Sequence, residues 1–455
     1  MTKMNRRDFL RTSGAAAAAA SFAATPGLAW SQGVGTTAPF PDYKALVCVF
    51  LFGGNDSYNM VVPNTAAEYN AYAASRQNLA IAQQDLLPIN PVSQAGANPF
   101  GFHPSMPGMQ GLFETGKAAV VANVGPLVEP TTRDQFFNQS VTLPSQLFSH
   151  NDQQDQWHAL KGAGTSKTGW AGRIADLIRT SVATQQMATN ASLFGTSLWQ
   201  SADESIAYVM GQTGPLAFTG FSDDPNDITY DQKRAFMRIV EAQYGSIYER
   251  AFAEIQQRAI AAADSVSAAI DSAPVLNTAF PNSQLGRQLE TVARLIGSRD
   301  QLQMQRQIFF VATGGFDSHD DQNENQPDLL GGISEAITAF YEATVELSIA
   351  DAVTTFTQSD FGRTLTSNGD GTDHAWGGNQ LVVGDSVAGQ DFYGTYPLLQ
   401  IGGPDDVGGG RMIPTTSADQ FAATLARWFG VPDIDLDIVA PHIGNFAQRD
   451  LGFMV

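Results

Sequence analysis

Residues 45–54 read ALVCVFLFGG, eight apolar side chains in a row followed by a pair of glycines. A short apolar run bounded by a turn signal is typical of a strand buried on both faces of a parallel sheet. Open α/β sheets bind their ligands at the carboxyl ends of such strands. We therefore expect the chemistry of this protein to begin just after residue 54.

Strands and helices alternate along the chain. Residues 103–116 predict a short helix and 118–124 a second buried strand, which would complete a βαβ unit with a right-handed connection. In the C-terminal half, strands are predicted at 307–313 and 352–357, on either side of a helix at 328–348. This alternation predicts an α/β fold with a doubly wound, mostly parallel sheet and helices on both faces.

The remaining segments predict one domain. Further elements are expected as a helix starting at Ser149, helices at 170–181, 236–273, 284–296 and 417–429, and strands at 380–383 and 398–401. We find neither an internal repeat of roughly 20 to 50 residues nor a low-complexity linker. The sequence therefore predicts a single domain over residues 40–455, with a helical insertion at about 230–300.

The first 31 residues have the order of an export signal. Arg6 and Arg7 are adjacent in a basic start, an alanine-rich apolar run covers 15–24, and Pro26 closes it. This order predicts export by the twin-arginine (Tat) translocase, a periplasmic or secreted protein, and a cofactor inserted before export. The apolar run is too short for a membrane span, so no stable membrane anchor is expected.

Composition and charge exclude certain classes of partner and of metal site. The chain has 455 residues and a formal net charge of -20, or about -23 without the signal segment, which holds four basic residues and one acid. Such an acidic surface repels phosphate backbones, so no nucleic-acid partner is expected. Cys48, the only cysteine, lies in the first apolar run, which excludes an internal disulfide and a zinc site built on several cysteines.

Polar side chains gather in five groups after predicted strands, at a helix start and in a glycine-rich loop. The groups are GGNDS (53–57), SHND (149–152), GGFDSHD (314–320), SDFGR (359–363) and DHAWGG (373–378). Mixed carboxylate and imidazole ligands suit a hard or borderline divalent ion, and two such ions if all the groups converge. Zinc and calcium are the expected metals.

Each acid has a functional and a structural interpretation. Asp56 is either a metal ligand or the cap of the following helix. Asp317 and His319 are at alternate positions past a strand end, where both can turn inward as ligands or form loop hydrogen bonds. Asp360 is a ligand or a turn acid that pairs with Arg363.

Four further histidines divide into one candidate ligand and three loop or packing residues. His374 follows Asp373 in a glycine-rich loop and is a candidate ligand, with Asp373 orienting its imidazole. His103, His158 and His442 are interpreted as loop or packing residues.

Ser149 is the candidate nucleophile. It stands at a predicted helix start, where the backbone N–H groups and the helix dipole favour an anion and lower the cost of a serine alkoxide. The alternative is that Ser149 only caps this helix.

Seven segments, over about 44–429, together resemble a known family. They are FLFGGNDSYNMVVP, HPSMPGMQGLFETGKAAVVANVG, LFSHNDQQDQW, TGWAGRIADL, VATGGFDSHDDQ, TQSDFGRTLTSNGDGTDHAWGGNQLVVG and GTYPL. In this order they resemble the bacterial family of Tat-exported, sulfatase-like proteins called domain of unknown function 1501, within the alkaline phosphatase superfamily. The resemblance implies a sheet with helices on both faces and one or two divalent ions at its strand ends.

The resemblance also implies roles for single residues. Ser149 corresponds to the nucleophile, and the metal ligands correspond to Asp56, Asp317, His319, Asp360 and His374. Residues expected to support these ligands are Asn55, Ser57, His150, Asp320, Arg363 and Asp373.

The sequence departs from the superfamily pattern at two points. Phe361 stands where phosphatases usually have a histidine after the late acid, so a second metal site would be weak, absent or completed by another residue such as His150. The sulfatase signature Cys-x-Pro-x-Arg is missing, so formylglycine chemistry at a cysteine is not expected.

Two functions follow from this reading. The first is a metal-dependent hydrolase of phosphate or sulfate esters, acting on a small molecule or a polysaccharide. The alternative is a non-catalytic binding or scaffold protein of the cell envelope that keeps the sulfatase-like fold.

Overall fold

A computed structural model describes residues 39–94, 99–162, 164–215, 221–222 and 224–455. The predicted signal segment, residues 1–31, lies outside the described residues. The helices are α2 (Ser57–Met60), α3 (Ala66–Arg76), α4 (Pro107–Glu114), α5 (Arg133–Asn138), α6 (His150–Ala159), α7 (Trp170–Ile178), α8 (Tyr230–Val240), α9 (Ile247–Asp271), α10 (Gln284–Gly297), α11 (Gln322–Glu346), α12 (Ala418–Phe429) and α13 (Leu436–Val439).

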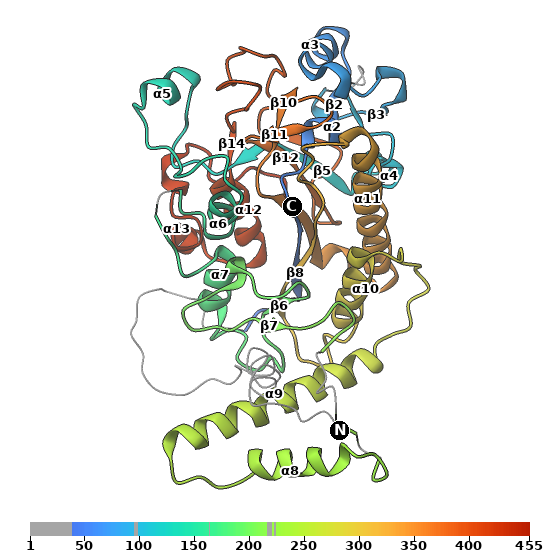
Figure 1. Ribbon diagram of the computed structural model, residues 1–455, viewed down its shortest axis with the longest axis vertical. Coiled ribbons are helices and arrows are strands. Elements are labelled where there is room, and N and C mark those ends of the chain that lie inside the picture. Colours follow the sequence, from blue (N-terminus) through green and yellow to red (C-terminus); the bar gives the residue numbers. More distant parts are fainter. Residues whose placement is uncertain (1–38, 95–98, 163, 216–220, 223) are drawn as a thin grey trace.

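A mostly parallel sheet forms the centre of the molecule (Figure 1). Its strand order is β13-β5-β12-β9-β1-β8-β6-β7, with β14 paired to β5. The strands are β1 (Lys44–Leu51), β5 (Ala118–Gly125), β6 (Asn190–Ser192), β7 (Tyr208–Val209), β8 (Arg306–Thr313), β9 (Val353–Ser359), β12 (Gly378–Val383), β13 (Phe392–Tyr393) and β14 (Thr416–Ser417). Strand β12 alone runs antiparallel to its neighbours β5 and β9 among the described strands of this sheet.

Two small sheets lie outside the central one. One has three strands in the order β2 (Val61–Pro63), β4 (Phe100–Phe102) and β3 (Leu87–Ile89), and the other is a hairpin of β10 (Arg363–Ser367) and β11 (Thr372–His374).

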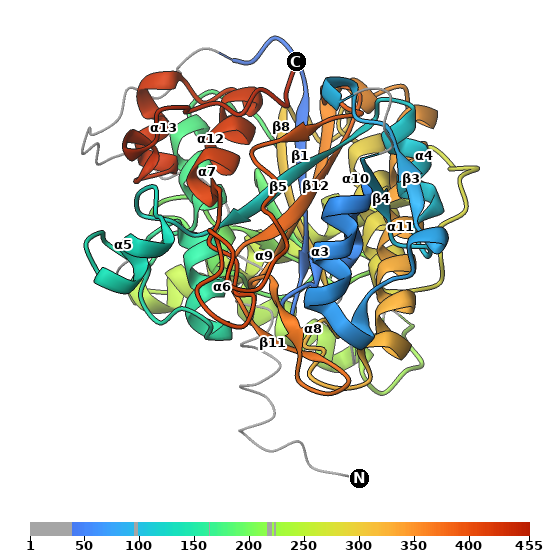
Figure 2. The same ribbon diagram turned by 90° about the horizontal axis from the view of Figure 1, so that it is seen from above.

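Side chains of β1 alternate between two cores, one on each face of the sheet. Val47 and Val49 pack in a core with residues of α4, α10 and α11, whereas Leu46 and Cys48 pack in a core with residues of α6, α7 and α12. Figure 2 shows α4, α10 and α11 on one side of the strands and α7, α12 and α13 on the other. The doubly wound α/β prediction is therefore confirmed, and Cys48 is a buried core residue as expected.

Two sequence predictions for the strands were wrong. Residues 398–401 form no strand, because their backbone makes no ladder hydrogen bonds and they run as an irregular loop. Strands β1 and β5, predicted as one βαβ unit, are not neighbours, since β9 and β12 lie between them. Both errors concern pairing between distant segments, which local apolar patterns do not encode.

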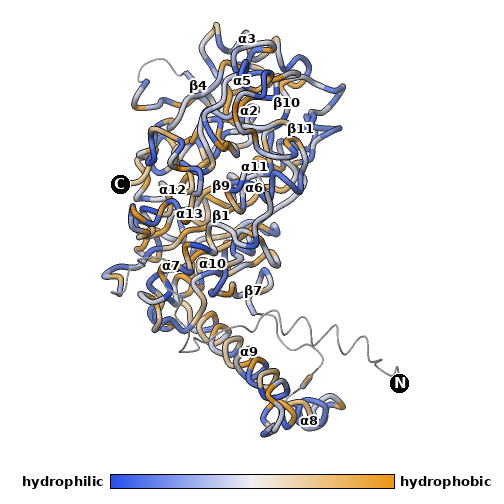
Figure 3. Tube along the Cα trace, turned by 90° about the vertical axis from the view of Figure 1, so that its left-hand side faces the viewer, coloured by the Kyte–Doolittle hydropathy of each residue, from blue (hydrophilic) through white to orange (hydrophobic). Residues whose placement is uncertain are grey.

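The helical region after residue 230 differs in part from the prediction. The alanine-rich stretch at 236–273 is not one helix but α8 and α9, separated at residues 241–246. These two helices project from the body of the molecule (Figure 3), whereas α10 packs against α11 and β8.

Candidate metal-binding site

The central strands end in register at one edge of the sheet. Leu51 of β1 pairs with Thr313 of β8 on one side and with Ser359 of β9 on the other. The polar groups after these strands therefore start side by side. The β10–β11 hairpin adds a further wall, because Thr372 N donates to Ser318 O at 2.9 Å.

His150, Asp317 and His374 form the centre of a cluster at this edge. Each offers one ligand atom, and these atoms all lie within 4.8 Å of one another. Asp317 Oδ1 lies 3.4 Å from His150 Nε2 and 3.3 Å from His374 Nε2. His319 joins them, with its Nε2 at 3.1 Å from Asp317 Oδ1 and 2.9 Å from His374 Nε2. Asp317 and His374 thus belong to two sets of three donors, one completed by His150 and the other by His319.

The outer nitrogen of each imidazole has an oxygen partner. His150 Nδ1 lies 2.7 Å from Asp360 Oδ2, His319 Nδ1 3.3 Å from Asp373 Oδ1, and His374 Nδ1 2.9 Å from the carbonyl oxygen of Phe148. Since oxygen acceptors select the tautomer with the proton on Nδ1, the three Nε2 lone pairs face the cluster. This is the arrangement of metal-ligating histidines held by carboxylate or carbonyl partners.

A divalent cation fits the inner side of this cluster. His150 Nε2 is buried and has no hydrogen-bond partner in the described part of the chain. The 2.9 Å between His319 Nε2 and His374 Nε2 cannot be a hydrogen bond if both nitrogens carry lone pairs. Two ligands of one tetrahedral zinc, each at about 2.0–2.1 Å from the metal, stand about 3.4 Å apart, close to the spacings seen around Asp317.

Asp360 is the buried support of His150. Its Oδ2 accepts hydrogen bonds from Gln154 Nε2 at 2.9 Å and Gly53 N at 3.2 Å besides its contact with His150. Burial raises the pKa of Asp360 above its ordinary value, against the hydrogen bonds from Gln154 and His150, which lower it. Asp360 Oδ1 has no hydrogen-bond partner among the described residues.

Asp317 is the charged and accessible member of the cluster. Burial raises its pKa, but the hydrogen bond and charge of Arg363 and the charges of His150 and His319 outweigh that effect, so the pKa is lowered. Its side chain is 48% exposed, whereas that of Asp360 is fully buried. The cluster is thus open to solvent on the Asp317 side, as a catalytic metal site requires.

The segment before α6 holds Ser149 next to the cluster. Phe148 has a φ of 71°, a strained value for a bulky residue, and its carbonyl oxygen contacts His374. Gln153 Oε1 accepts from Phe148 N at 2.6 Å, and the Arg411 guanidinium lies 5.2 Å from the Phe148 ring. Phe148 and His150 both contact the cluster, so the backbone of Ser149 is held beside it.

Ser149 is the N-cap residue of α6, but its hydroxyl does not cap a helix N–H. Ser149 Oγ instead donates to Asp152 Oδ2 at 2.6 Å. A carboxylate that accepts from a serine hydroxyl can also take its proton, so Asp152 is a candidate general base.

The structure does not bring every predicted ligand into the cluster. Asp56 is buried outside the cluster, where its Oδ2 pairs with the Arg76 guanidinium and accepts from Gln322 Nε2. Asp56 therefore belongs to a separate buried polar network and does not lie among the histidines.

The predicted supporting residues have mixed positions. Arg363 donates to Asp317 Oδ1 at 2.8 Å and does not pair with Asp360, and Asp373 contacts His319 rather than His374. Asn55 and Ser57 are buried, and Ser57 Oγ accepts from Asn379 N of β12 at 2.7 Å. Asp320 is exposed at the surface.

The three histidines outside the cluster are held by packing or by loop contacts. His158 is buried beside the rings of Phe50 and Phe310, and burial lowers its pKa to about 3. Burial also lowers the pKa of His103, to about 4. The hydrogen bond and charge of Asp419 raise the pKa of His442.

Sequence reasoning missed several residues that contact the cluster or its predicted ligands. Gln154 lies one helical turn after His150, a spacing that places both on one face of α6 and could have indicated a shared partner. Asp152, at the third position of the helix, is a similar local signal. Arg76, Gln322 and the carbonyl of Phe148 carry no such signal, because each acts on a residue far away in the chain.

One family model matches most of the chain. Residues 43–434 match the family described as "Protein of unknown function (DUF1501)". The chain belongs to this family. No curated protein matches this member of the family.

Solved structures match only distantly. A crystal structure of Ps i-CgsB is similar with a TM-score of 0.35 and 9% identity, covering 89% of this chain and 77% of that one. A structure from work on glycosaminoglycan metabolism by Bacteroides thetaiotaomicron is similar with a TM-score of 0.32 and 11% identity, covering 86% and 74%. The lipoteichoic acid synthase LtaP from Listeria monocytogenes is similar with a TM-score of 0.30 and 9% identity, covering 90% and 74%. These values are too low to transfer an activity.

The N-terminus matches a second family model. Residues 3–23 match the signal sequence of the twin-arginine translocation pathway. The protein is therefore a substrate of the Tat translocase and is exported to the periplasm or beyond. No helix within the described ranges combines the length and the apolar character that a membrane span needs.

Proposed function

We propose that this protein is a metal-dependent hydrolase of phosphate or sulfate esters in the periplasm or outside the cell. The observation that carries the proposal is the convergence of three imidazole Nε2 atoms on the Asp317 carboxylate, next to a serine at a helix start.

The donor set favours zinc over calcium. Calcium prefers six to eight oxygen ligands, whereas imidazole nitrogens with one carboxylate suit zinc. His150, Asp317 and His374 would hold the ion, with His319 as a further ligand. When bound, such an ion supplies Lewis-acid chemistry and positive charge that offsets the charge of the ester oxygens.

Ser149 is the proposed nucleophile, and Asp152 the group that accepts its proton. The serine oxygen bonds to the phosphorus or sulfur of the ester as the bond to the alcohol oxygen breaks, and the alcohol leaves with a proton. Water then hydrolyses the seryl ester and restores Ser149. The hydrogen bond of 2.6 Å from Ser149 Oγ to Asp152 Oδ2 already aligns the proton with the carboxylate. The N-terminus of α6 favours negative charge, both on a serine oxygen and on the oxygens of a bound ester.

The remaining side chains keep the ligands in place. Asp360 holds the ring of His150, and Arg363 holds the carboxylate of Asp317. The ring of Phe361 lies 4.7 Å from the rings of both His150 and His374 and forms an apolar wall beside them.

The test is elemental analysis followed by an ester assay on the mature protein, exported through its own signal. We expect about one equivalent of zinc in the native protein and its loss in the double variant Asp317→Ala/His319→Ala. Asp320→Ala, which removes an exposed neighbouring acid, serves as the matched control and should keep the metal.

Ser149→Ala separates catalysis from metal binding. It should retain zinc and lose about 100-fold or more of the hydrolysis rate on p-nitrophenyl phosphate or p-nitrophenyl sulfate, because general base and nucleophile act together. A metal-free native protein, or full activity in Ser149→Ala, would overturn the proposal.

A second candidate is a non-catalytic binding or scaffold protein of the cell envelope. Phe361 motivates it, since an apolar ring fills the position where the superfamily pattern usually has a second metal-binding histidine. Stoichiometric zinc without turnover of either ester would support this candidate over the hydrolase.

A further inference from the structure

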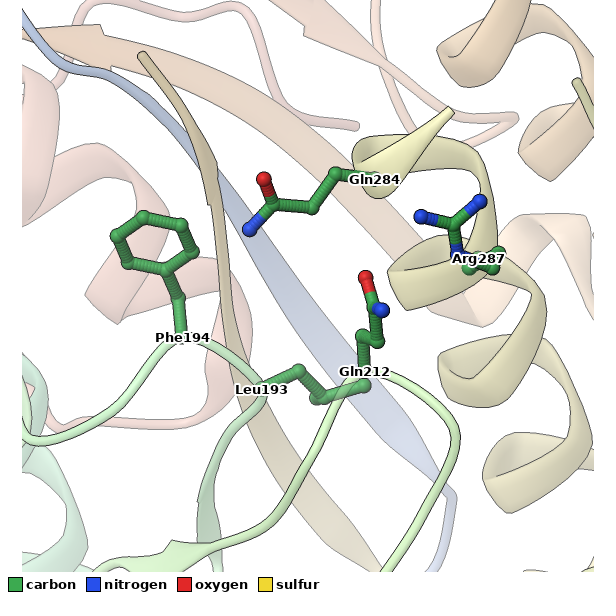
Figure 4. Close-up of a pocket in the computed structure, with 5 residues that line it drawn as sticks. All are labelled: Leu193, Phe194, Gln212, Gln284 and Arg287. Atoms are coloured by element: carbon green, nitrogen blue, oxygen red, sulfur yellow. The ribbon is translucent and has the colours of Figure 1, made fainter. Parts of the chain in front are cut away.

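A pocket of about 490 Å³ lies on the carboxyl side of the sheet, next to the end of β6. It is lined by Leu193, Phe194, Gln212, Gln284 and Arg287, and Figure 4 shows the carboxamides of Gln212 and Gln284 pointing into the space between these elements. Leu193 and Phe194 directly follow β6, so the pocket opens at the carboxyl end of this strand.

The pocket is joined to the cluster by short steps. The ring of Phe194 stacks on Phe52 at 5.5 Å, and the residue after Phe52, Gly53, donates to Asp360. Strand β6 is next to β8, whose end leads to Asp317. The last residue of β6, Ser192, pairs with Phe310, so β6 ends three residues before β8 does at Thr313.

The walls of the pocket are fixed by specific bonds. Gln288, one position after Arg287, pairs with both the N–H and the C=O of Ala312 in β8, at 3.0 and 2.9 Å. This pairing holds the first turn of α10 against the sheet. Thr291 Oγ1 donates to Gln212 O at 2.8 Å and holds the loop after β7 against the same helix.

Arg287 gives the pocket its charge. In a chain of net charge -20, its guanidinium has no ion pair with any carboxylate that the structure describes, and its Nη1 donates to the neutral Asn282 Oδ1 at 2.8 Å. The other donors of the guanidinium can therefore bind an anionic group in the forked geometry that arginine offers.

The side chains around Arg287 suit a saccharide. Carboxamides of Gln212 and Gln284 can exchange hydrogen bonds with hydroxyl groups, and the Phe194 ring offers an apolar face to a sugar ring. We propose that this pocket is a substrate subsite that binds an anionic saccharide unit next to the ester being cleaved. The proposal rests on the hydrolase function and specifies its substrate as an extended, multiply anionic glycan.

Calorimetric titration of the metal-loaded protein tests this subsite. The probes are a sulfated dextran oligosaccharide and the unsulfated oligosaccharide of the same length. We expect the sulfated probe to bind about tenfold tighter, and Arg287→Gln to abolish that preference, since a charge-assisted hydrogen bond contributes about a factor of ten. Gln284 is exposed, and Gln284→Ala should weaken the binding of both probes.

Two controls test whether the effect belongs to Arg287 and not to a general loss of positive charge or of zinc. Arg250→Gln removes an exposed arginine of α9 and should leave both affinities unchanged, and zinc content should be the same in all three variants. A carboxymethyl dextran oligosaccharide that binds through Arg287 more tightly than the sulfated probe would identify a carboxylate as the anionic group.

Equal binding of charged and neutral probes, or unchanged binding in Arg287→Gln, would overturn the subsite. The double variant Asp317→Ala/His319→Ala separates it from the hydrolase proposal. Binding that depends on Arg287 and persists in this zinc-free variant would show that the subsite does not need the metal. The hydrolase proposal would fail, with the subsite left standing, if the native protein showed the same Arg287-dependent binding but held no zinc and turned over neither ester.

Discussion

His150 is the residue whose two nitrogens connect the buried and the open parts of the site. Its Nδ1 contacts Asp360, which is buried at the end of β9, and its Nε2 faces Asp317, which is half-exposed. A carboxylate behind a metal-bound imidazole raises its basicity and fixes its orientation. Asp360 is therefore expected to act on a bound metal through His150 rather than as a ligand itself.

Substitution of Asp360 by Asn tests this role. Asp360→Asn keeps the size of the side chain and an oxygen acceptor for His150 but removes the charge. Zinc affinity should fall about 10- to 100-fold, the usual effect of losing such a partner, as measured by competition with a chromogenic chelator. Asp351→Asn, an exposed acid before β9, should leave the affinity unchanged. Complete loss of zinc in Asp360→Asn would instead indicate a direct ligand.

At the scale of elements, the turn after β1 is shaped by close approach to the loop after β8. Gly53 has a φ of 116°, and a Cβ atom there would lie 2.3 Å from Asp317 N. Only glycine permits both this backbone conformation and this distance. The turn therefore sets the position of Asp317 relative to Asp360, to which Gly53 N also donates.

Gly53→Ala should damage the site and the fold together. The positive φ costs about 1 kcal/mol or more in a residue with a Cβ, and the overlap with Asp317 must displace that loop. We expect lower zinc occupancy and a lower free energy of unfolding, measured by elemental analysis and urea titration.

Gly111→Ala in α4 is the matched control, because a Cβ there meets nothing within 4 Å. An alanine in a helix interior should stabilise the protein by up to about 1 kcal/mol. Equal effects of the two substitutions would contradict the role given to Gly53.

At the scale of the whole molecule, metal binding should stabilise the native state. An ion that binds only the folded protein adds about 2.7 kcal/mol at 100 times its dissociation constant. Thermal unfolding should therefore shift to higher temperature when zinc is added to chelator-treated protein, and not in Asp317→Ala/His319→Ala. An unchanged midpoint in the native protein would argue against a site preformed by the fold.

Acid should destabilise the protein through its buried neutral histidines, of which His158 has the lower pKa. The pKa of His158 is about 3 in the folded state, below its ordinary value of 6.5, so the unfolded chain binds more protons between these pH values. Stability is then lost as pH falls from 6.5 towards 3, by about 1.4 kcal/mol per pH unit. His158→Leu should flatten the slope of unfolding free energy against pH by about that amount.

His442 is a control, because its effect on the pH dependence of stability has the opposite sign to that of His158. Asp419 raises its pKa, so protonated His442 contributes stability below pH 6.5 that is lost as pH rises through its folded pKa. His442→Gln should therefore cost more stability at pH 6 than at pH 8. Equal pH profiles for both variants and the native protein would contradict the two assignments.

The apolar runs and the order of polar groups predict much of this protein. Strands β1, β5 and β8 are short apolar runs typical of buried strands, and β9 is a run rich in β-branched residues. Asp317, His319, Asp360 and His374 follow strand ends or glycine-rich turns, and chain topology brings strand ends to one edge. The export signal is likewise a local pattern.

Contacts between distant segments decide the rest. The antiparallel direction of β12, the separation of β1 from β5 and the loop at 398–401 depend on pairing that no window of residues encodes. The partners of Asp56 and His150 are 20 and 210 residues away in the chain. Their roles are therefore set by packing at the edge of the sheet. The same side chain can be a metal ligand, the support of a ligand or half of a buried ion pair, and the charge that the fold places beside it decides which.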